Sequence, residues 1–170
     1  MSGNEKIKFI LPDGTELEFP KGSSVLQVAE QIGPGLARKA LAGKLNGQII
    51  GLSDEVDEGG DLKILTFDDE EGKEIFWHSS AHLMAQAVKR LYPEAQLGIG
   101  PPIDDGFYYD IDLDHTITPE DFQKIETEMA RIVDEDHQIV RKEWEKKDAV
   151  KYFDQENEDL KLDLLAELED

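Results

Sequence analysis

Two histidines four residues apart are the part of this sequence best suited to chemistry. They lie in residues 78–82, which read His-Ser-Ser-Ala-His. On an α-helix, side chains four residues apart project from the same face, one turn above the other. A folded domain rarely stacks two imidazoles for packing alone. The spacing of His78 and His82 therefore predicts a polar pocket wall on a helix.

Metal chemistry is one use of such a pair, and the sequence argues against it. A zinc-protease helix needs a glutamate directly after the first histidine as general base, and Ser79 stands there. A metal site needs at least one more ligand. The chain has no cysteine, and nothing places His115 or His137 near the pair. We therefore expect no metal at His78 and His82. Taken alone, the pair is also compatible with two surface histidines without a role.

A second segment, residues 97–110, brings glycines and aromatic residues together. It reads Leu-Gly-Ile-Gly-Pro-Pro-Ile-Asp-Asp-Gly-Phe-Tyr-Tyr-Asp. It is not a dinucleotide-binding fingerprint, because the third glycine is missing and prolines follow directly. The functional interpretation is that a glycine such as Gly100 allows the backbone to approach a ligand closely, because no side chain is in the way. The alternative is a strand whose Tyr108 and Tyr109 serve ordinary packing.

The elements before residue 68 predict a small β-grasp domain, a four-stranded sheet wrapped on one helix. A hairpin turns at Pro12-Asp13-Gly14-Thr15, and Ser24 with Gln27 forms a capping box that begins a helix. We expect further elements in the following order: a short helix at 36–41 and strands at 44–50 and 62–66. Residues 1–67 are thus predicted as one domain, followed by a polar linker at 68–73.

Residues 74–170 predict a second segment of mixed helix and strand, so the chain falls in the α+β class. A helix from about Lys73 to Tyr92 stops at Pro93, and Thr118-Pro119 begins a second long helix. We expect the other elements in the following order: a strand-like stretch at 96–113, a strand at 137–144, a short helix at 147–153 and an apolar, acidic end at 160–168.

Composition restricts the partners and the compartment. Residues 1–67 carry a net charge of −3 and residues 68–170 carry −18, which together make the −21 of the chain. Such acidity opposes nonspecific nucleic-acid binding, which depends on neutralising phosphates. The chain shows no disulfide framework, no apolar run approaching the roughly 20 residues of a membrane span, and no signal peptide. We expect a cytoplasmic protein that does not associate with membranes.

Together these residues resemble the N-terminal region of bacterial threonyl-tRNA synthetases. Residues 6–67 look like the TGS domain of that family, and residues 74–170 look like the first part of its editing domain. The resemblance rests on residues 78–82, the Pro93 helix stop, and the runs 99–103 and 105–110. It implies a protein that handles the 3′ end of threonine tRNA and removes serine mischarged on it. His78 and His82 would be catalytic, and Gly100 and Tyr109 would bind substrate.

The sequence also departs from that family. The family's later Cys-x-x-x-His segment would come after Asp170, as would the class II aminoacylation core. The core would use ATP, Mg and Zn, so we expect no cofactor within these residues. We expect an N-terminal fragment that does not charge tRNA, hydrolyses seryl-tRNA poorly or not at all, and is monomeric where the family forms homodimers. The alternative is a non-enzymatic β-grasp module that binds RNA or protein.

Overall fold

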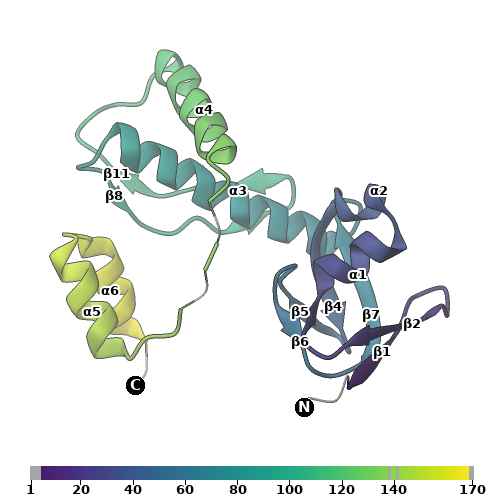
Figure 1. Ribbon diagram of the computed structural model, residues 1–170. Helices are drawn as coiled ribbons and strands as arrows, with labels where there is room; N and C mark the ends of the chain where they lie inside the picture. The colour runs from purple at the N-terminus through teal and green to yellow at the C-terminus, as the bar shows by residue number, and fades with distance from the viewer. Residues whose placement is uncertain (1–4, 138, 141, 169–170) are drawn as a thin grey trace. The chain divides into compact units, whose positions relative to one another are not determined.

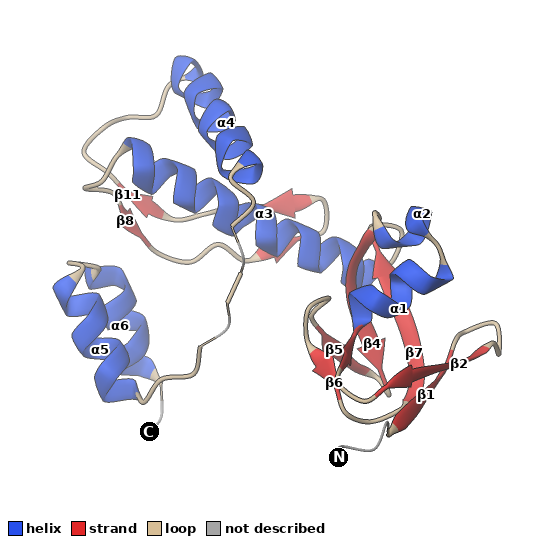
Figure 2. Cartoon of the chain, viewed as in Figure 1, coloured by secondary structure: helices blue, strands red, loops and turns tan. Residues whose placement is uncertain are grey.

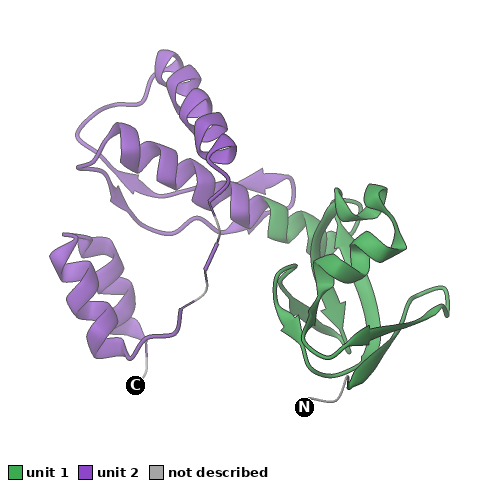
Figure 3. Ribbon diagram, in the orientation of Figure 1, with its two compact units in different colours: residues 1–76 green, residues 77–170 purple. Residues whose placement is uncertain are grey.

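The computed structural model describes residues 5–137, 139–140 and 142–168. They divide between Phe76 and Trp77 into two compact units, called unit 1 and unit 2 here (Figure 3). Unit 1 has a sheet with strand order β2-β1-β7-β4-β5 (Figure 1), in which β1 and β7 run parallel and the other neighbours run antiparallel. Its elements are β1 (Lys6–Ile10), β2 (Glu16–Pro20), β3 (Ser23–Ser24), α1 (Val25–Ile32), α2 (Pro34–Ala37), β4 (Ala40–Leu45), β5 (Gln48–Ile50), β6 (Glu55–Val56) and β7 (Gly60–Thr66).

The core of unit 1 lies between this sheet and α1. Apolar side chains of the strands and the helix are buried together, which is the arrangement of a β-grasp fold. They are Ile7, Phe9, Phe19, Val25, Val28, Ala29, Ala40, Val56, Leu62 and Ile64. The predicted capping box is present, since the Ser24 hydroxyl accepts a hydrogen bond from the Gln27 amide and Gln27 accepts one from the Ser24 amide.

Two predictions for unit 1 were wrong in detail. The short helix expected at 36–41 is α2, which ends at Ala37, and β4 already begins at Ala40. The single strand expected at 44–50 is instead the hairpin of β4 and β5. It turns at Asn46 and Gly47, which have positive φ values of 49° and 86°. Asn-Gly is the preferred sequence for such a turn, so the sheet has five strands instead of four.

Unit 2 is mainly helical, with short strand pairs (Figure 2). Its elements are α3 (Glu70–Leu91, beginning in unit 1), β8 (Gln96–Leu97), β9 (Pro102–Ile103), β10 (Gly106–Phe107), β11 (Ile111–Asp112), α4 (Pro119–Asp134), α5 (Lys146–Gln155) and α6 (Asp159–Glu167). Buried residues of α3 and α4 form its core with Ala95. They are Ala87, Val88, Ala95, Ile125 and Ile132.

The secondary structure of the residues before α3 and after α4 differs from the prediction. Residues 70–73, expected in the linker, form the first turn of α3. A Cβ atom at Gly72 would lie 1.8 Å from the Thr66 carbonyl oxygen, so this turn lies directly against the end of β7. The strand expected at 137–144 is absent from its described residues 137, 139–140 and 142–144. Ile139 is 94% exposed, and a strand requires a paired neighbour that these residues do not have here.

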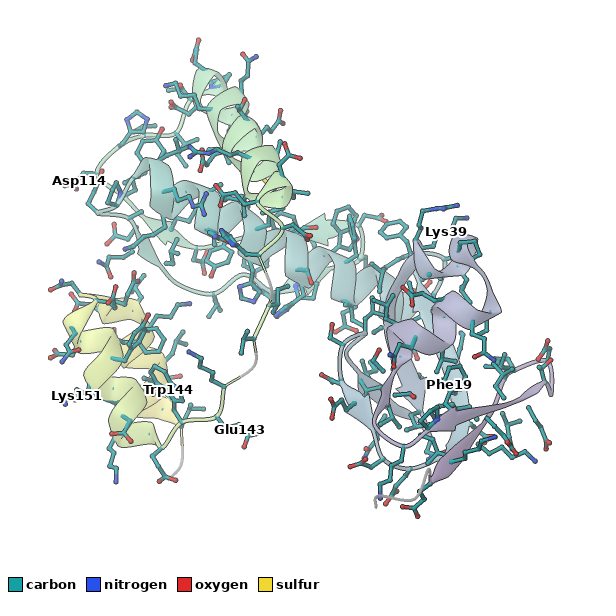
Figure 4. All side chains as sticks on the ribbon, in the orientation of Figure 1. Phe19, Lys39, Asp114, Glu143, Trp144 and Lys151 are labelled. Carbon is teal, nitrogen blue, oxygen red and sulfur yellow. The ribbon has the colours of Figure 1, made fainter. Side chains whose placement is uncertain are left out.

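Each tryptophan of unit 2 lies beside another aromatic ring. Trp77 on α3 is 6.4 Å from Phe107, measured between ring centroids. Trp144, labelled in Figure 4, precedes α5 and meets the ring of Tyr152 edge to face at 5.0 Å. These are the two tryptophans of the sequence, so tryptophan fluorescence reports on unit 2.

An ion-pair network joins α3 to α4 and predicts how unit 2 responds to acid. Arg90 donates to both carboxylate oxygens of Glu135, at 2.9 and 2.7 Å, and to Glu128 at 3.1 Å. Arg90 lowers the pKa of Glu135 to about 2. An unfolded glutamate titrates near pH 4.3, so the stability from Glu135 is complete above that pH and is lost as the pH falls towards 2.

We expect Arg90→Gln to move the acid unfolding of unit 2 to a higher pH, because the variant lacks the stability that the pairing of Glu135 with Arg90 contributes above about pH 4. Tryptophan fluorescence during acid titration measures the midpoint. Lys147→Gln, on the exposed surface of α5, is the control. Equal midpoints for the two variants would contradict the prediction.

Candidate functional site

The two predicted histidines lie together on the exposed side of α3. Their Nε2 atoms are 3.0 Å apart, and their ring centroids are 4.7 Å apart with the ring planes at 70°. Ala81 and Ala85 on the same helix are buried in unit 2. The helix thus uses its small residues for packing and leaves the imidazoles accessible to a ligand.

The hydrogen bond between the rings limits the protonation states of the two histidines. A bond between two imidazole nitrogens needs one N–H and one free lone pair, so one of the facing nitrogens is unprotonated. The pKa of His82 lies below its ordinary value, first because its surroundings are partly desolvated and then because of the positive charges of His78 and Lys161. His82 is therefore a neutral imidazole at neutral pH, able to accept a proton from a bound water.

Gly100 and Tyr109 form a second close contact. A Cβ atom at Gly100 would lie 2.1 Å from Cδ2 of the Tyr109 ring, so only glycine fits there. The surrounding backbone is paired, because the Gly98 amide donates to the Asp110 carbonyl and the Asp110 amide donates to the Ile99 carbonyl, both at 2.9 Å. Burial, and to a lesser extent the negative charge of Glu158, raises the pKa of Tyr109. Its hydroxyl therefore stays protonated and can donate a hydrogen bond.

Lys161 on α6 connects these two pairs, and sequence reasoning missed it. Its Nζ donates to the Gly98 carbonyl at 2.6 Å and lies 6.0 Å from the centroid of the Tyr109 ring. Its charge contributes to the lowered pKa of His82. Burial lowers the pKa of Lys161 itself, and the negative charge of Glu158 partly opposes that effect. One sequence signal was available, since Lys161 is the single basic residue in the acidic stretch 152–170.

The other two histidines have partners elsewhere. His115 Nε2 is 2.8 Å from the Asp121 carboxylate, and the ring stacks on Tyr92 at 5.2 Å. His137 Nε2 is 2.9 Å from a Glu135 carboxylate oxygen. Within the described residues, no group of three or more His, Cys, Asp or Glu side chains could hold a metal ion. The expectation of no metal at the pair stays a prediction.

The site therefore combines side chains from three parts of unit 2. They are the imidazoles of α3, the glycine and tyrosine between β8 and β11, and the ammonium of α6. A neutral imidazole beside a cation is suited to activating water and to stabilising the negative charge that develops when an ester is attacked. The catalytic and binding roles of the four predicted residues stay predictions.

Comparison with known proteins identifies the domain first. Residues 7–66 match the family model of the TGS domain, so unit 1 contains a TGS domain, and the β-grasp assignment is confirmed. Nearly the whole chain is homologous to the N-terminal part of bacterial threonine–tRNA ligases, as the resemblance of the motifs indicated.

The relatives are much longer than this chain. The chain is 53% identical over 162 residues to the threonine–tRNA ligase of Syntrophomonas wolfei, and 49% identical over 162 residues to those of Geobacillus kaustophilus and Clostridioides difficile. These alignments cover 95% of this chain and 25–26% of each relative. The chain thus spans about a quarter of the length of these relatives. None of the described helices is long and apolar enough to cross a membrane.

Proposed function

We propose that unit 2 forms part of a pocket that hydrolyses serine from mischarged threonine tRNA. The observation that carries the proposal is the imidazole pair on α3, whose Nε2 atoms are 3.0 Å apart, together with the Lys161 charge that acts on His82. Threonine differs from serine by one methyl group, and such a group gives only roughly 1–3 kcal/mol of discrimination. An enzyme that charges threonine therefore needs a second site that accepts the smaller residue.

Each side chain has a defined task in this reaction. His82 takes a proton from a water molecule as the water oxygen attacks the ester carbonyl carbon. The bond from that carbon to the ribose oxygen then breaks, and the ribose oxygen takes the proton that His82 received from the water. The Lys161 ammonium lies near the developing oxyanion and stabilises it, as fixed positive groups do in such sites. Gly100 lets the adenosine approach the backbone beside Tyr109.

The wider role follows from the relatives. We propose that the whole protein is a cytoplasmic threonine–tRNA ligase whose partner here is the 3′ end of threonine tRNA. The homodimer, the monomeric state of this chain and the use of ATP, Mg and Zn elsewhere in a longer protein remain predictions. With a net charge of −21, the chain requires a local RNA contact. A β-grasp module that binds RNA or protein without catalysis is the competing function.

The experiment that tests this function is an amide NMR titration with a non-hydrolysable seryl-adenosine analogue. We expect shifts at the amides of His78, His82, Gly100 and Tyr109, larger than those caused by the threonyl analogue. A well-dispersed spectrum that responds to neither analogue would contradict the editing function. If the same spectrum shifts in unit 1 when tRNA is added, the non-catalytic module is favoured.

A variant makes the binding test more specific. His82→Ala removes one hydrogen-bonding group worth about 1 kcal/mol, so we expect the seryl analogue to bind roughly fivefold more weakly. His137→Ala is the matched control, because His137 is exposed and pairs with Glu135, directly after α4. If both variants bind the analogue as the unchanged chain does, His82 has no part in the site.

A further inference from the structure

Glu158 is a buried carboxylate that the proposed reaction does not use. It precedes α6 and is only 9% exposed. One oxygen, Oε1, lies 2.7 Å from Nζ of Lys89 on α3. The other, Oε2, is buried without a hydrogen-bond partner among the described residues. Burying a carboxylate that is only partly paired costs free energy. A folded protein that keeps one therefore has a structural or functional use for it.

Three side chains hold the beginning of α6 against the end of α3 and β8. Lys89 contacts Glu158 and also donates to the Ala95 carbonyl at 2.7 Å. Gln96 donates to the Asn157 carbonyl at 2.7 Å and accepts from the Asp159 amide at 3.0 Å. We call Lys89, Gln96 and Glu158 the α6 clamp. It fixes the first turn of α6 from two directions.

The clamp lies directly beside the residue that joins the two halves of the site. Lys161 follows Glu158 by three residues, so it lies on the same side of the helix, one turn further along. Its long side chain reaches the Gly98 carbonyl and the Tyr109 ring. The clamp thus fixes the turn of α6 from which the Lys161 side chain extends.

We propose that Glu158 is a positioning residue, which fixes α6 to α3 through Lys89 and thereby keeps the Lys161 ammonium near His82 and Tyr109. The importance of this placement for ester hydrolysis rests on the function proposed above. The position of the Lys161 ammonium does not depend on that function, and it can be measured without any substrate.

The charges around His82 provide the measurement. His78 on α3 and Lys161 on α6 are the titratable groups that act on His82, and both lower its pKa. Glu158 acts on Lys161 and Tyr109. If α6 leaves its place, His82 loses the positive charge of Lys161, and its pKa rises. Greater exposure of His82 to water would raise its pKa in the same direction, so Lys161→Gln, which removes the charge alone, is needed to give the part that is due to the charge.

The test is an NMR titration of all four histidines in the full chain. We expect Glu158→Gln to move the His82 midpoint to a higher pH, and Lys89→Gln to do the same. Lys161→Gln sets the size of the shift that results when the charge is lost completely. Gln96→Ala is a milder variant for the case that Glu158→Gln does not fold, and we expect a smaller shift in the same direction.

The controls separate positioning from general damage. Glu156→Gln, an exposed carboxylate two residues away, should leave His82 unchanged. His115 and His137 should keep their midpoints in every variant, since their partners lie on α4 or directly after α3 and α4. An unchanged His82 midpoint in both Glu158→Gln and Gln96→Ala would overturn the proposal. Failure of the seryl analogue to bind would overturn the proposed function and leave this result intact.

Discussion

Gly100→Ala should disrupt the candidate site more than any other single methyl group added to unit 2. The new Cβ atom would lie 2.1 Å from Cδ2 of Tyr109 and 2.6 Å from Cε2, well inside van der Waals contact. The ring must move, and it then leaves the Lys161 ammonium. Such overpacking costs typically 1–3 kcal/mol. We expect unit 2 to lose roughly that stability and the seryl analogue to bind about tenfold more weakly or worse.

Chemical denaturation followed by tryptophan fluorescence measures the stability, and the analogue titration measures the binding. Gly35→Ala is the matched control. Gly35 lies in α2 of unit 1 with nothing within 4 Å of a Cβ atom, so that change should leave both the fluorescence transition of unit 2 and the binding of the analogue unchanged. If Gly100→Ala folds and binds the seryl analogue like the unchanged chain, the close approach of Gly100 to Tyr109 is important for neither stability nor binding.

Phe9→Ala should unfold unit 1 far below the melting temperature of the unchanged chain. Phe9 is fully buried in the core, and its ring lies 6.0 Å from the Phe19 ring, measured between ring centroids. Removing a buried phenylalanine costs about 3–5 kcal/mol, while a domain of this size has roughly 4–10 kcal/mol in total. We expect the melting temperature of unit 1 to fall by more than about 10 °C.

Amide signals of β1 and β7, followed by NMR as the temperature rises, report on unit 1 alone. Tryptophan fluorescence should show unit 2 unaffected at the temperature where unit 1 has unfolded. Ile49→Ala is the control, because Ile49 is half exposed on β5 and should change stability by less than about 0.5 kcal/mol. Equal melting curves for the two variants would show that Phe9 is not a core residue.

The sequence was most informative where a local pattern alone determines the structure. The four-residue spacing of His78 and His82 was sufficient to place both rings on one face, because helical geometry depends on spacing alone. The capping residues Ser24 and Thr118 marked two helix starts correctly. Such signals act over three or four residues and need no knowledge of the rest of the fold.

Predictions failed where the structure of a segment depends on residues far away in the sequence. Residues 137–144 have apolar side chains suited to a strand, yet pairing requires a partner that lies elsewhere in the chain. Lys161 shows the same limit for the site. Its neighbours in sequence predict only an apolar, acidic end, and its importance comes from contacts with Gly98 and Tyr109, 63 and 52 positions earlier. No local pattern encodes such contacts.

The spread of the site along the chain has a consequence for synthesis on the ribosome. His82 is made 79 residues before Lys161. At roughly 5–20 residues per second, translation needs about 4–16 s to cover that distance. The strands of unit 1 are all available by Thr66, so its sheet can form while α6 does not yet exist. The TGS domain of a nascent chain can thus form first. The imidazole pair is made several seconds before Lys161, so the two parts of the site cannot meet until then.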